Sequence, residues 1–265
     1  MPPLKPNNNF QLQWNFGFFV AILLGGQILI HLLKGKFPRF RNLLEQMMIV
    51  GPGSLFSVLL IAFFAGMIFT VQVARELIKY GAVSAVGGAF ALAFCRELAP
   101  ILTASIVAGQ VGSAFAAEIG EMQVTEQIDA LYMLKTDPID YLIIPRVIAC
   151  CLMLPILTIF ALTVGLMGGV FVAAYFYNIN SSVFLNSVQN FLELRDLLSI
   201  VLKSLVFGAF ISLIGCGCGM ATKGGAKGVS RATTTAVVST WIAIFAGDFL
   251  ISLAIFHELG INSNL

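Results

Sequence analysis

Long apolar runs, separated by short charged segments, constrain this chain more than any other feature of its sequence. The runs are residues 16–33, 47–74, 83–112, 141–177, 197–220 and 232–256. A helix needs about 20 apolar residues to cross the hydrocarbon core of a bilayer, and all runs but the first exceed that length. Only 11% of the residues are charged, against about a quarter in soluble domains. We therefore predict an all-α polytopic membrane protein.

The first run, residues 16–33, differs from the others. It is short for a crossing, contains Gly25, Gly26 and Gln27, and is followed by a cluster of basic residues. Such a profile is typical of a helix that lies in the membrane interface. We favour this interfacial interpretation, and a true span is the alternative.

The distribution of basic residues supports the interfacial helix, because Lys and Arg prefer cytoplasmic loops. The main basic groups share one side of the membrane only if the first run does not cross. They are Lys34 to Arg41, Lys135 with Arg146, and Lys223 with Lys227 and Arg231. We therefore expect five transmembrane helices after the interfacial helix, with the N-terminus in the cytoplasm and the C-terminus outside.

The expected organisation is a tail and interfacial helix over residues 1–46, a transmembrane domain over 47–256, and a short external tail over 257–265. Pro52, Pro145 and Pro155 lie inside apolar runs. Proline removes a hydrogen bond from a helix, so we expect Pro52 to kink its helix or delay its start. We expect Pro145 and Pro155 to divide the run over residues 141–177 into an entry piece and a span.

Charged residues interrupt two of the predicted spans. Arg96 and Glu97 lie near the middle of the third apolar run, and Asp248 lies inside the last. Each such charge costs roughly 3 kcal/mol or more unless it is paired or faces water. One interpretation places Arg96 and Glu97 in a polar cavity that binds a substrate headgroup. The other is a structural ion pair, with Asp248 as the candidate partner of Arg96.

An acidic amphipathic segment follows the third apolar run. On a helix over about residues 113–136, Met122 joins an apolar side, and Glu118, Glu121 and Glu126 form a polar side. A helix with an apolar stripe outside the bilayer is typical of a surface that binds another protein. A solvated interfacial helix is the alternative.

The sequence contains no catalytic or metal-binding motif that we can identify. There is no Walker motif, no G-x-S-x-G and no H-E-x-x-H, and Cys216 and Cys218 have no accompanying His or second Cys pair. We therefore expect no enzyme activity, no cofactor and no metal in this chain. The net charge of +2 gives no indication of nucleic-acid binding. If the chain is a transporter, it has no ATPase site of its own, so it must take its energy from a gradient or from another chain.

Several short motifs occur in a characteristic order. They are Arg96-Glu97-Leu98-Ala99-Pro100, Ala108-Gly109-Gln110-Val111-Gly112-Ser113-Ala114, Ala117-Glu118-Ile119-Gly120-Glu121-Met122, Thr125-Glu126-Gln127-Ile128-Asp129-Ala130-Leu131 and Ser230-Arg231-Ala232-Thr233-Thr234-Thr235. Together they closely resemble the MlaE family. Its members are permease subunits of ABC systems that move phospholipids between bacterial membranes, with relatives in the chloroplast envelope. The resemblance covers about residues 40–256.

The resemblance implies a homodimeric permease that works with other proteins. Cytoplasmic ABC ATPase subunits, which hold ATP and Mg, would bind a coupling helix within about residues 113–136. Glu118, Glu121, Met122 and Glu126 are the candidate ATPase-coupling residues. A protein with an MCE domain would exchange lipid with the permease on the outer side of the membrane.

The same resemblance makes Arg96, Glu97 and Asp248 candidate lipid-pocket or gating residues, in a multi-pass protein of the bacterial cell inner membrane. The substrate would be a phospholipid or a glycolipid. The main alternative is a stand-alone secondary transporter or channel in which these three residues relay ions. It predicts inverted repeats, and we find none in the sequence.

Overall fold

The computed structural model describes residues 25–26 and 40–262 of the chain, and the side chains of residues 40–255 among them. The predicted interfacial helix lies outside the described residues, apart from Gly25 and Gly26. Its position relative to a membrane therefore stays a prediction.

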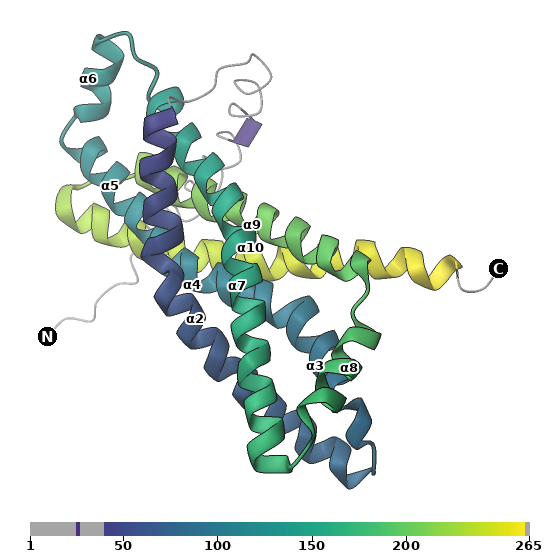
Figure 1. The fold of residues 1–265 in the computed structure, drawn as a ribbon. Helices are drawn as coiled ribbons and strands as arrows, with labels where there is room; N and C mark the ends of the chain where they lie inside the picture. The colour runs from purple at the N-terminus through teal and green to yellow at the C-terminus, as the bar shows by residue number, and fades with distance from the viewer. Residues whose placement is uncertain (1–24, 27–39, 263–265) are drawn as a thin grey trace, which may run out of the picture. The chain divides into compact units, whose positions relative to one another are not determined.

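Every regular element of the described residues is a helix (Figure 1). In chain order the elements are α2 (Phe40–Lys79), η1 (Val83–Ala85), α3 (Val86–Phe90), η2 (Ala91–Leu98), α4 (Ala99–Val107), η3 (Ala108–Gly112), α5 (Ser113–Val124), α6 (Gln127–Met133), η4 (Ile139–Ile143), α7 (Ile144–Tyr177), α8 (Ser181–Phe191), α9 (Leu194–Met220) and α10 (Gly225–Asn262). The all-α prediction is thereby confirmed for this part of the chain.

Five of the helical stretches are long and apolar enough to cross a membrane. They are Phe40–Lys79, Val83–Val124, Ile139–Tyr177, Leu194–Met220 and Gly225–Ile255. Their number agrees with the prediction, and the chain is a polytopic membrane protein.

Pro52 and Pro155 do not end their helices. Pro52 lies inside α2, which has already begun at Phe40, and Pro155 lies inside α7. The expected division of the helix at Pro155 and late start near Pro52 are therefore wrong. Pro145 lies in the first turn of α7, directly after the π-helix η4, so the run does divide close to that residue. Neighbouring helices can satisfy the backbone groups that proline frees, which makes proline tolerable inside membrane helices.

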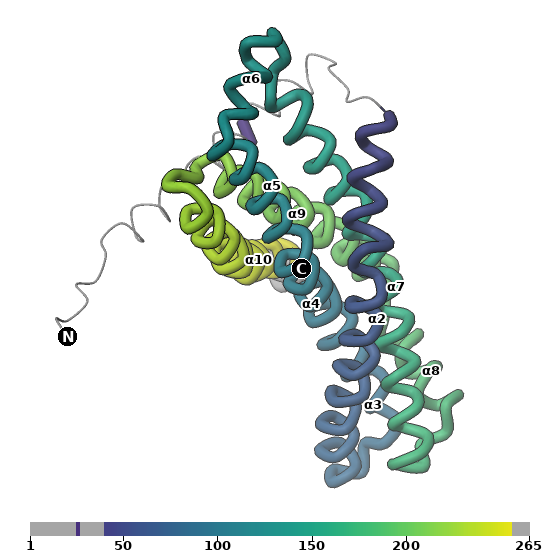
Figure 2. Tube along the Cα trace, turned by 90° about the vertical axis from the view of Figure 1, so that its left-hand side faces the viewer, coloured from purple at the N-terminus to yellow at the C-terminus, as the bar shows by residue number. Residues whose placement is uncertain are grey.

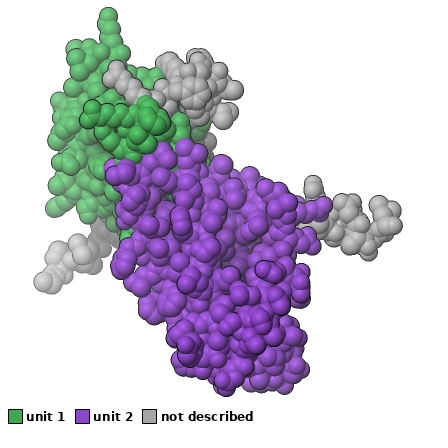
Figure 3. Space-filling model, viewed as in Figure 1, with its two compact units in different colours: residues 1–46, 108–149, 209–243 green, residues 47–107, 150–208, 244–265 purple. Residues whose placement is uncertain are grey.

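The described chain forms two compact units (Figure 3). Unit 1 contains residues 1–46, 108–149 and 209–243, and unit 2 contains residues 47–107, 150–208 and 244–265. Each unit has its own set of packed helices, and each carries one of the two groups of predicted functional residues.

Aromatic side chains and glycines hold unit 2 together. The rings of Phe90 and Phe94 stack with centroids 4.8 Å apart, and Phe184 of α8 packs against Phe90 at 5.6 Å. Gly87 lies so close to the backbone of α8 that a Cβ atom would meet the carbonyl oxygen of Phe184. Small residues allow helix backbones to approach in this way. Figure 2 shows α8 alongside α3.

Unit 1 is built around a similar close approach and carries a helical hairpin. A Cβ atom at Gly215 of α9 would lie 2.8 Å from the carbonyl oxygen of Gly112. Ala116, Ile214, Cys218 and Ala236 form its buried cluster. The hairpin consists of α5 and α6 with the turn that leads into η4, and α6 lies at its tip (Figures 1 and 2).

Candidate functional site

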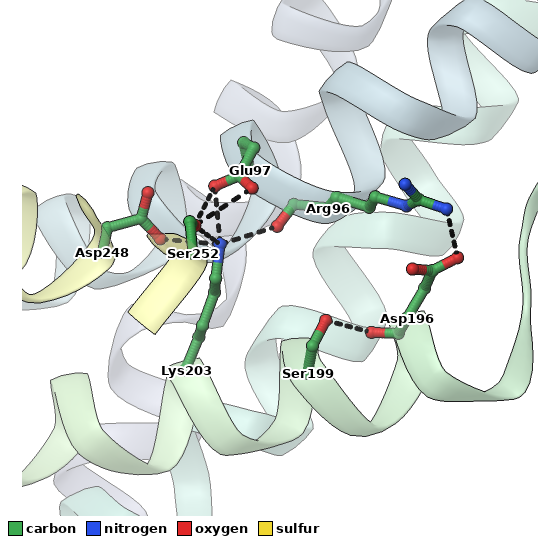
Figure 4. Close-up of polar contacts among 7 residues, drawn as sticks. All are labelled: Arg96, Glu97, Asp196, Ser199, Lys203, Asp248 and Ser252. Carbon is green, nitrogen blue, oxygen red and sulfur yellow. Dashed lines mark hydrogen bonds and ion pairs between the residues drawn. The ribbon is translucent and has the colours of Figure 1, made fainter. Parts of the chain in front are cut away.

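A cluster of charged side chains lies inside unit 2, at the point where the second of the five apolar stretches, Val83–Val124, changes its helical winding. Arg96 and Glu97 belong to η2, a π-helix. Such wider turns inside α-helices occur frequently at functional sites. In Figure 4 the side chains of these neighbouring residues extend in different directions, each toward a different partner.

Arg96 pairs with an acid at the start of α9. Its Nη2 lies 2.8 Å from Oδ2 of Asp196, a buried residue in the first turn of that helix. The same Oδ2 accepts a hydrogen bond from the backbone amide of Glu193, and the Arg96 guanidinium also donates to the carbonyl of Phe191 at 3.5 Å. Arg96 thus ties η2 to the turn between α8 and α9.

Glu97 belongs to a second group, centred on Lys203 of α9. The Nζ atom of Lys203 lies 2.6 Å from Oε2 of Glu97 and 3.0 Å from Oδ1 of Asp248 on α10. It also donates to the hydroxyl of Ser252 at 2.8 Å, and that hydroxyl donates to the Glu97 carboxylate at 3.2 Å. Three helical segments therefore meet on one ammonium group (Figure 4).

The expected pairing of Arg96 with Asp248 is wrong. Asp248 pairs with Lys203, and Arg96 pairs with Asp196. The structure does bring Glu97 and Asp248 together, because both contact Lys203. Arg96 and Glu97 do form ion pairs with other helices, as the structural interpretation predicted, but the partner of Arg96 is Asp196.

Lys203 and Asp196 are functional candidates that sequence reasoning missed. The signal was present: they are seven residues apart on one helix, a spacing that places both on the same face. Asp196 lies at the start of the span and Lys203 lies on the same face. Two charges on one face of a span indicate polar contacts inside the protein.

The exposure of the cluster determines which member can meet a ligand. The Lys203 side chain is 1% exposed and fully occupied by its partners, whereas the Glu97 side chain is 34% exposed. The cluster holds two cations and three carboxyl groups, so both cations are already compensated. Among the described residues, Glu97 is therefore the member best placed to accept hydrogen bonds from a bound molecule.

A search for three or more His, Cys, Asp or Glu side chains that could hold a metal ion finds none in the described part of the chain. The carboxylates of the cluster are engaged with Lys203 and Arg96 instead. The arrangement is suited to binding and orientation.

The candidate coupling residues lie on the α5–α6 hairpin of unit 1. The single helix expected over 113–136 is divided, because α5 ends at Val124 and Glu126 adopts a left-handed conformation with φ of 59°. Glu121 and Glu126 are exposed, and Met122 is half-buried. Beyond them, α6 ends in exposed apolar side chains, with Met133 87% exposed.

Glu118 differs from the other candidates on this hairpin. Its Oε2 accepts a charge-assisted hydrogen bond of 2.7 Å from Nη2 of Arg146, near the start of α7. Glu118 was predicted to face a partner protein, but its carboxylate contacts Arg146 of the same chain.

The described residues contain five apolar helical stretches, with paired charges inside unit 2 and a helical hairpin in unit 1 where the second stretch leads into the third. These features fit the class of membrane permeases. The family comparison agrees with this class. A sequence model described as Permease MlaE matches residues 43–254. The chain belongs to the MlaE permease family.

Relatives of this chain are found in cyanobacteria, plastids and other bacteria. A probable ABC transporter permease protein of Synechocystis sp. is 56% identical over 93% of this chain and 94% of that protein. The chloroplast protein TRIGALACTOSYLDIACYLGLYCEROL 1 of Arabidopsis thaliana is 47% identical over 90% of this chain and 68% of its own length. A probable ABC transporter permease protein of Rickettsia typhi is 42% identical over 83% and 86%.

Proposed function

We propose that this chain is the transmembrane permease subunit of an ATP-driven ABC transporter that moves a lipid, either a phospholipid or a glycolipid. Membership of a family whose relatives are named ABC transporter permeases supports the class. The name of the Arabidopsis relative refers to a galactolipid, which favours a lipid as the transported molecule.

The charged cluster of unit 2 is the observation that carries the lipid proposal. A lipid needs apolar walls for its acyl chains and a few fixed polar groups for its headgroup. Arg96, Glu97 and Asp248 are proposed to line or gate that pocket, with the half-buried Glu97 as the acceptor. Lys203 and Asp196 would hold these groups in place, because they are the partners observed in the structure.

The α5–α6 hairpin is the proposed docking element for the ATPase. Exposed Tyr132, Met133 and Leu134 at its tip offer an apolar surface, and Glu121 and Glu126 add charge beside it. Side chains of this type anchor helices in grooves of partner proteins. ATP and Mg would be held by the ATPase subunits, with hydrolysis there.

The remaining features follow from the same proposal. The permease would act as a homodimer in the bacterial inner membrane, with its N-terminus in the cytoplasm and its C-terminus outside. An MCE-domain protein on the outer side would deliver or receive the lipid. The basic residues around the hairpin, Lys135 and Arg146, support a cytoplasmic position for it.

The decisive test of this proposal is to identify what binds the intact chain. The tagged chain would be purified in mild detergent, and the proteins and lipids that accompany it identified by mass spectrometry. We expect an ABC ATPase, an MCE-domain protein and one enriched lipid class. Recovery of the chain without an ATPase, together with transport driven by an ion gradient, would contradict the proposal.

The pocket assignment has a separate test. We expect Glu97→Gln to reduce lipid transport at least about tenfold, because the carboxylate is lost where a headgroup would bind. The assembled complex should remain intact, since glutamine keeps the size of the side chain. Glu45→Gln, which removes an exposed acid paired with Arg41 at 3.3 Å, is the matched control. Transport at the normal rate in Glu97→Gln would refute the role of the cluster.

A further inference from the structure

Unit 1 contains a buried ion pair of its own, between Arg146 and Glu118. The Arg146 side chain is 7% exposed, whereas that of Glu118 is 48% exposed. The guanidinium is therefore the buried partner, and the carboxylate reaches it from the surface of α5.

The surroundings of Arg146 leave it dependent on this one acid. Its guanidinium lies 5.3 Å from the ring centroid of the buried Phe115, and Nη1 donates to the carbonyl of Leu142 at 3.3 Å. Its Nε has no hydrogen-bond partner. Glu118 is the one carboxylate paired with Arg146 among the described residues. A buried cation that loses its anion is strongly destabilised.

The position of the pair in the chain gives it a mechanical role. Glu118 lies on α5, the outgoing arm of the hairpin, and Arg146 lies near the start of α7, where the returning arm ends. The pair therefore joins the two arms at the base of the hairpin. Beyond the pair the hairpin has two backbone breaks, at Glu126 and Lys135, which adopt φ of 59° and 56°. No other ion pair joins the arms in the described residues.

We propose that the Glu118–Arg146 pair is a brace that transmits movement of the hairpin tip to α7. Glu118 is then a positioning residue for coupling, and it acts inside the permease instead of contacting the ATPase. This inference rests on the proposed function, because the movement would originate in an ATPase bound at the tip. Glu121 and Glu126 keep the docking role.

The test is a double-mutant cycle in the purified complex, with Glu118→Gln, Arg146→Met and the double variant. Glu45→Gln, which removes an exposed ion pair with Arg41 outside the hairpin, is the matched control. Three quantities are measured: the amount of ATPase that co-purifies, ATP turnover, and transport of a fluorescently labelled phospholipid in proteoliposomes. Thermal unfolding of each variant is followed in parallel.

We expect all three brace variants to lose transport by about tenfold, a typical coupling between sites, while the ATPase stays bound and active. The double variant should be no worse than either single variant, because both remove the same contact. Arg146→Met should unfold close to the normal temperature, since it removes the buried charge and leaves only an exposed acid. That combination, a stable protein with lost transport, is not expected of a merely structural pair.

Two outcomes would overturn the brace. Loss of the ATPase from Glu118→Gln but not from Arg146→Met would identify Glu118 as a docking contact. Losses that multiply in the double variant would show that the two residues act independently.

A measurement on the chain alone separates this inference from the proposed function. Trypsin cleavage after the exposed Lys135 reports how freely the hairpin opens. We expect faster cleavage in the three brace variants and an unchanged rate in Glu45→Gln. Equal rates in all variants would refute the brace, even if no ATPase were found. Faster cleavage without any ATPase would instead contradict the proposed function.

Discussion

At the residue scale, Lys203 is the group on which the charged cluster depends. It compensates two carboxylates, Glu97 and Asp248, and is itself 1% exposed. A buried ion pair contributes little net stability when intact, but removal of one partner leaves uncompensated charge. We therefore expect the loss of any one charged member of the cluster to lower the stability of the fold.

We expect Lys203→Met to destabilise the chain by about 3 kcal/mol or more, because the buried Asp248 and the half-buried Glu97 lose their counter-charge. Adding Asp248→Asn should recover part of the loss. The measurement is thermal unfolding in detergent. Lys79→Met is the control, since Lys79 pairs with Glu76 at 2.8 Å while both side chains are more than half exposed, and exposed pairs contribute at most about 1 kcal/mol. Equal effects of the two lysine changes would contradict the buried role of Lys203.

The sequence could predict which residues were charged inside spans, but not their partners. Arg96 and Asp196 are 100 positions apart, and hydropathy carries no information on which helices are neighbours. Asp248 was therefore assigned to the wrong cation. Lys203 was visible as a charge at the start of a span, and its partners became apparent only when α9 and α10 were placed beside η2.

At the element scale, glycines set the distance between helices. A Cβ atom at Gly66 of α2 would collide with the backbone carbonyl of Gly165 on α7, and one at Gly165 would meet the ring of Phe94. Backbone cannot move aside as a flexible side chain can. The contact between α2 and α7 is therefore fixed by the absence of side chains.

Substitution at this contact gives a direct test. We expect Gly66→Ala to destabilise the chain by roughly 1–3 kcal/mol, the usual effect of overpacking. Gly53→Ala on the same helix is the control, because its Cβ would lie 3.8 Å from the carbonyl oxygen of Met48, an ordinary van der Waals distance. That change should be neutral or slightly stabilising, since alanine favours helix. Unfolding in detergent measures both, and a harmless Gly66→Ala would show that α2 and α7 are not in close contact.

The elements themselves were largely predictable, because apolar run length determines a membrane helix. The features that the sequence did not predict concern local helix geometry. A left-handed Glu126 is unusual for a residue other than glycine, so nothing in the sequence marked the break between α5 and α6. The π-helical winding of η2 likewise has no sequence signature that we could use.

At the scale of the whole molecule, the orientation in the membrane is the main prediction still to be tested. Met133 lies at the exposed end of α6, and Asn190 is exposed on α8. Cysteine placed at these positions would be labelled by a membrane-impermeant thiol reagent. We expect labelling of Met133→Cys from the cytoplasmic side only and of Asn190→Cys from the outside only.

The chain suits this experiment, because four of its five cysteines are buried and Cys151 is half-buried. The unaltered chain is the background control. Labelling of both positions from the same side would contradict the topology and, with it, the cytoplasmic position of the hairpin. The sequence supports the orientation only through the distribution of basic residues, which is a statistical preference.

The turn between α8 and α9 has one further consequence, for how this region opens. The Phe191 carbonyl, the Glu193 amide and the Asp196 carboxylate all belong to it, and all are joined through Arg96 or its partner. On the other side, the Gly88 amide of α3 donates to Ser187 of α8. We expect these segments to open as one cooperative unit. Amide hydrogen exchange at Glu193 should then accelerate together with that at Gly88 in Asp196→Asn, and separate responses would show that the turn opens alone.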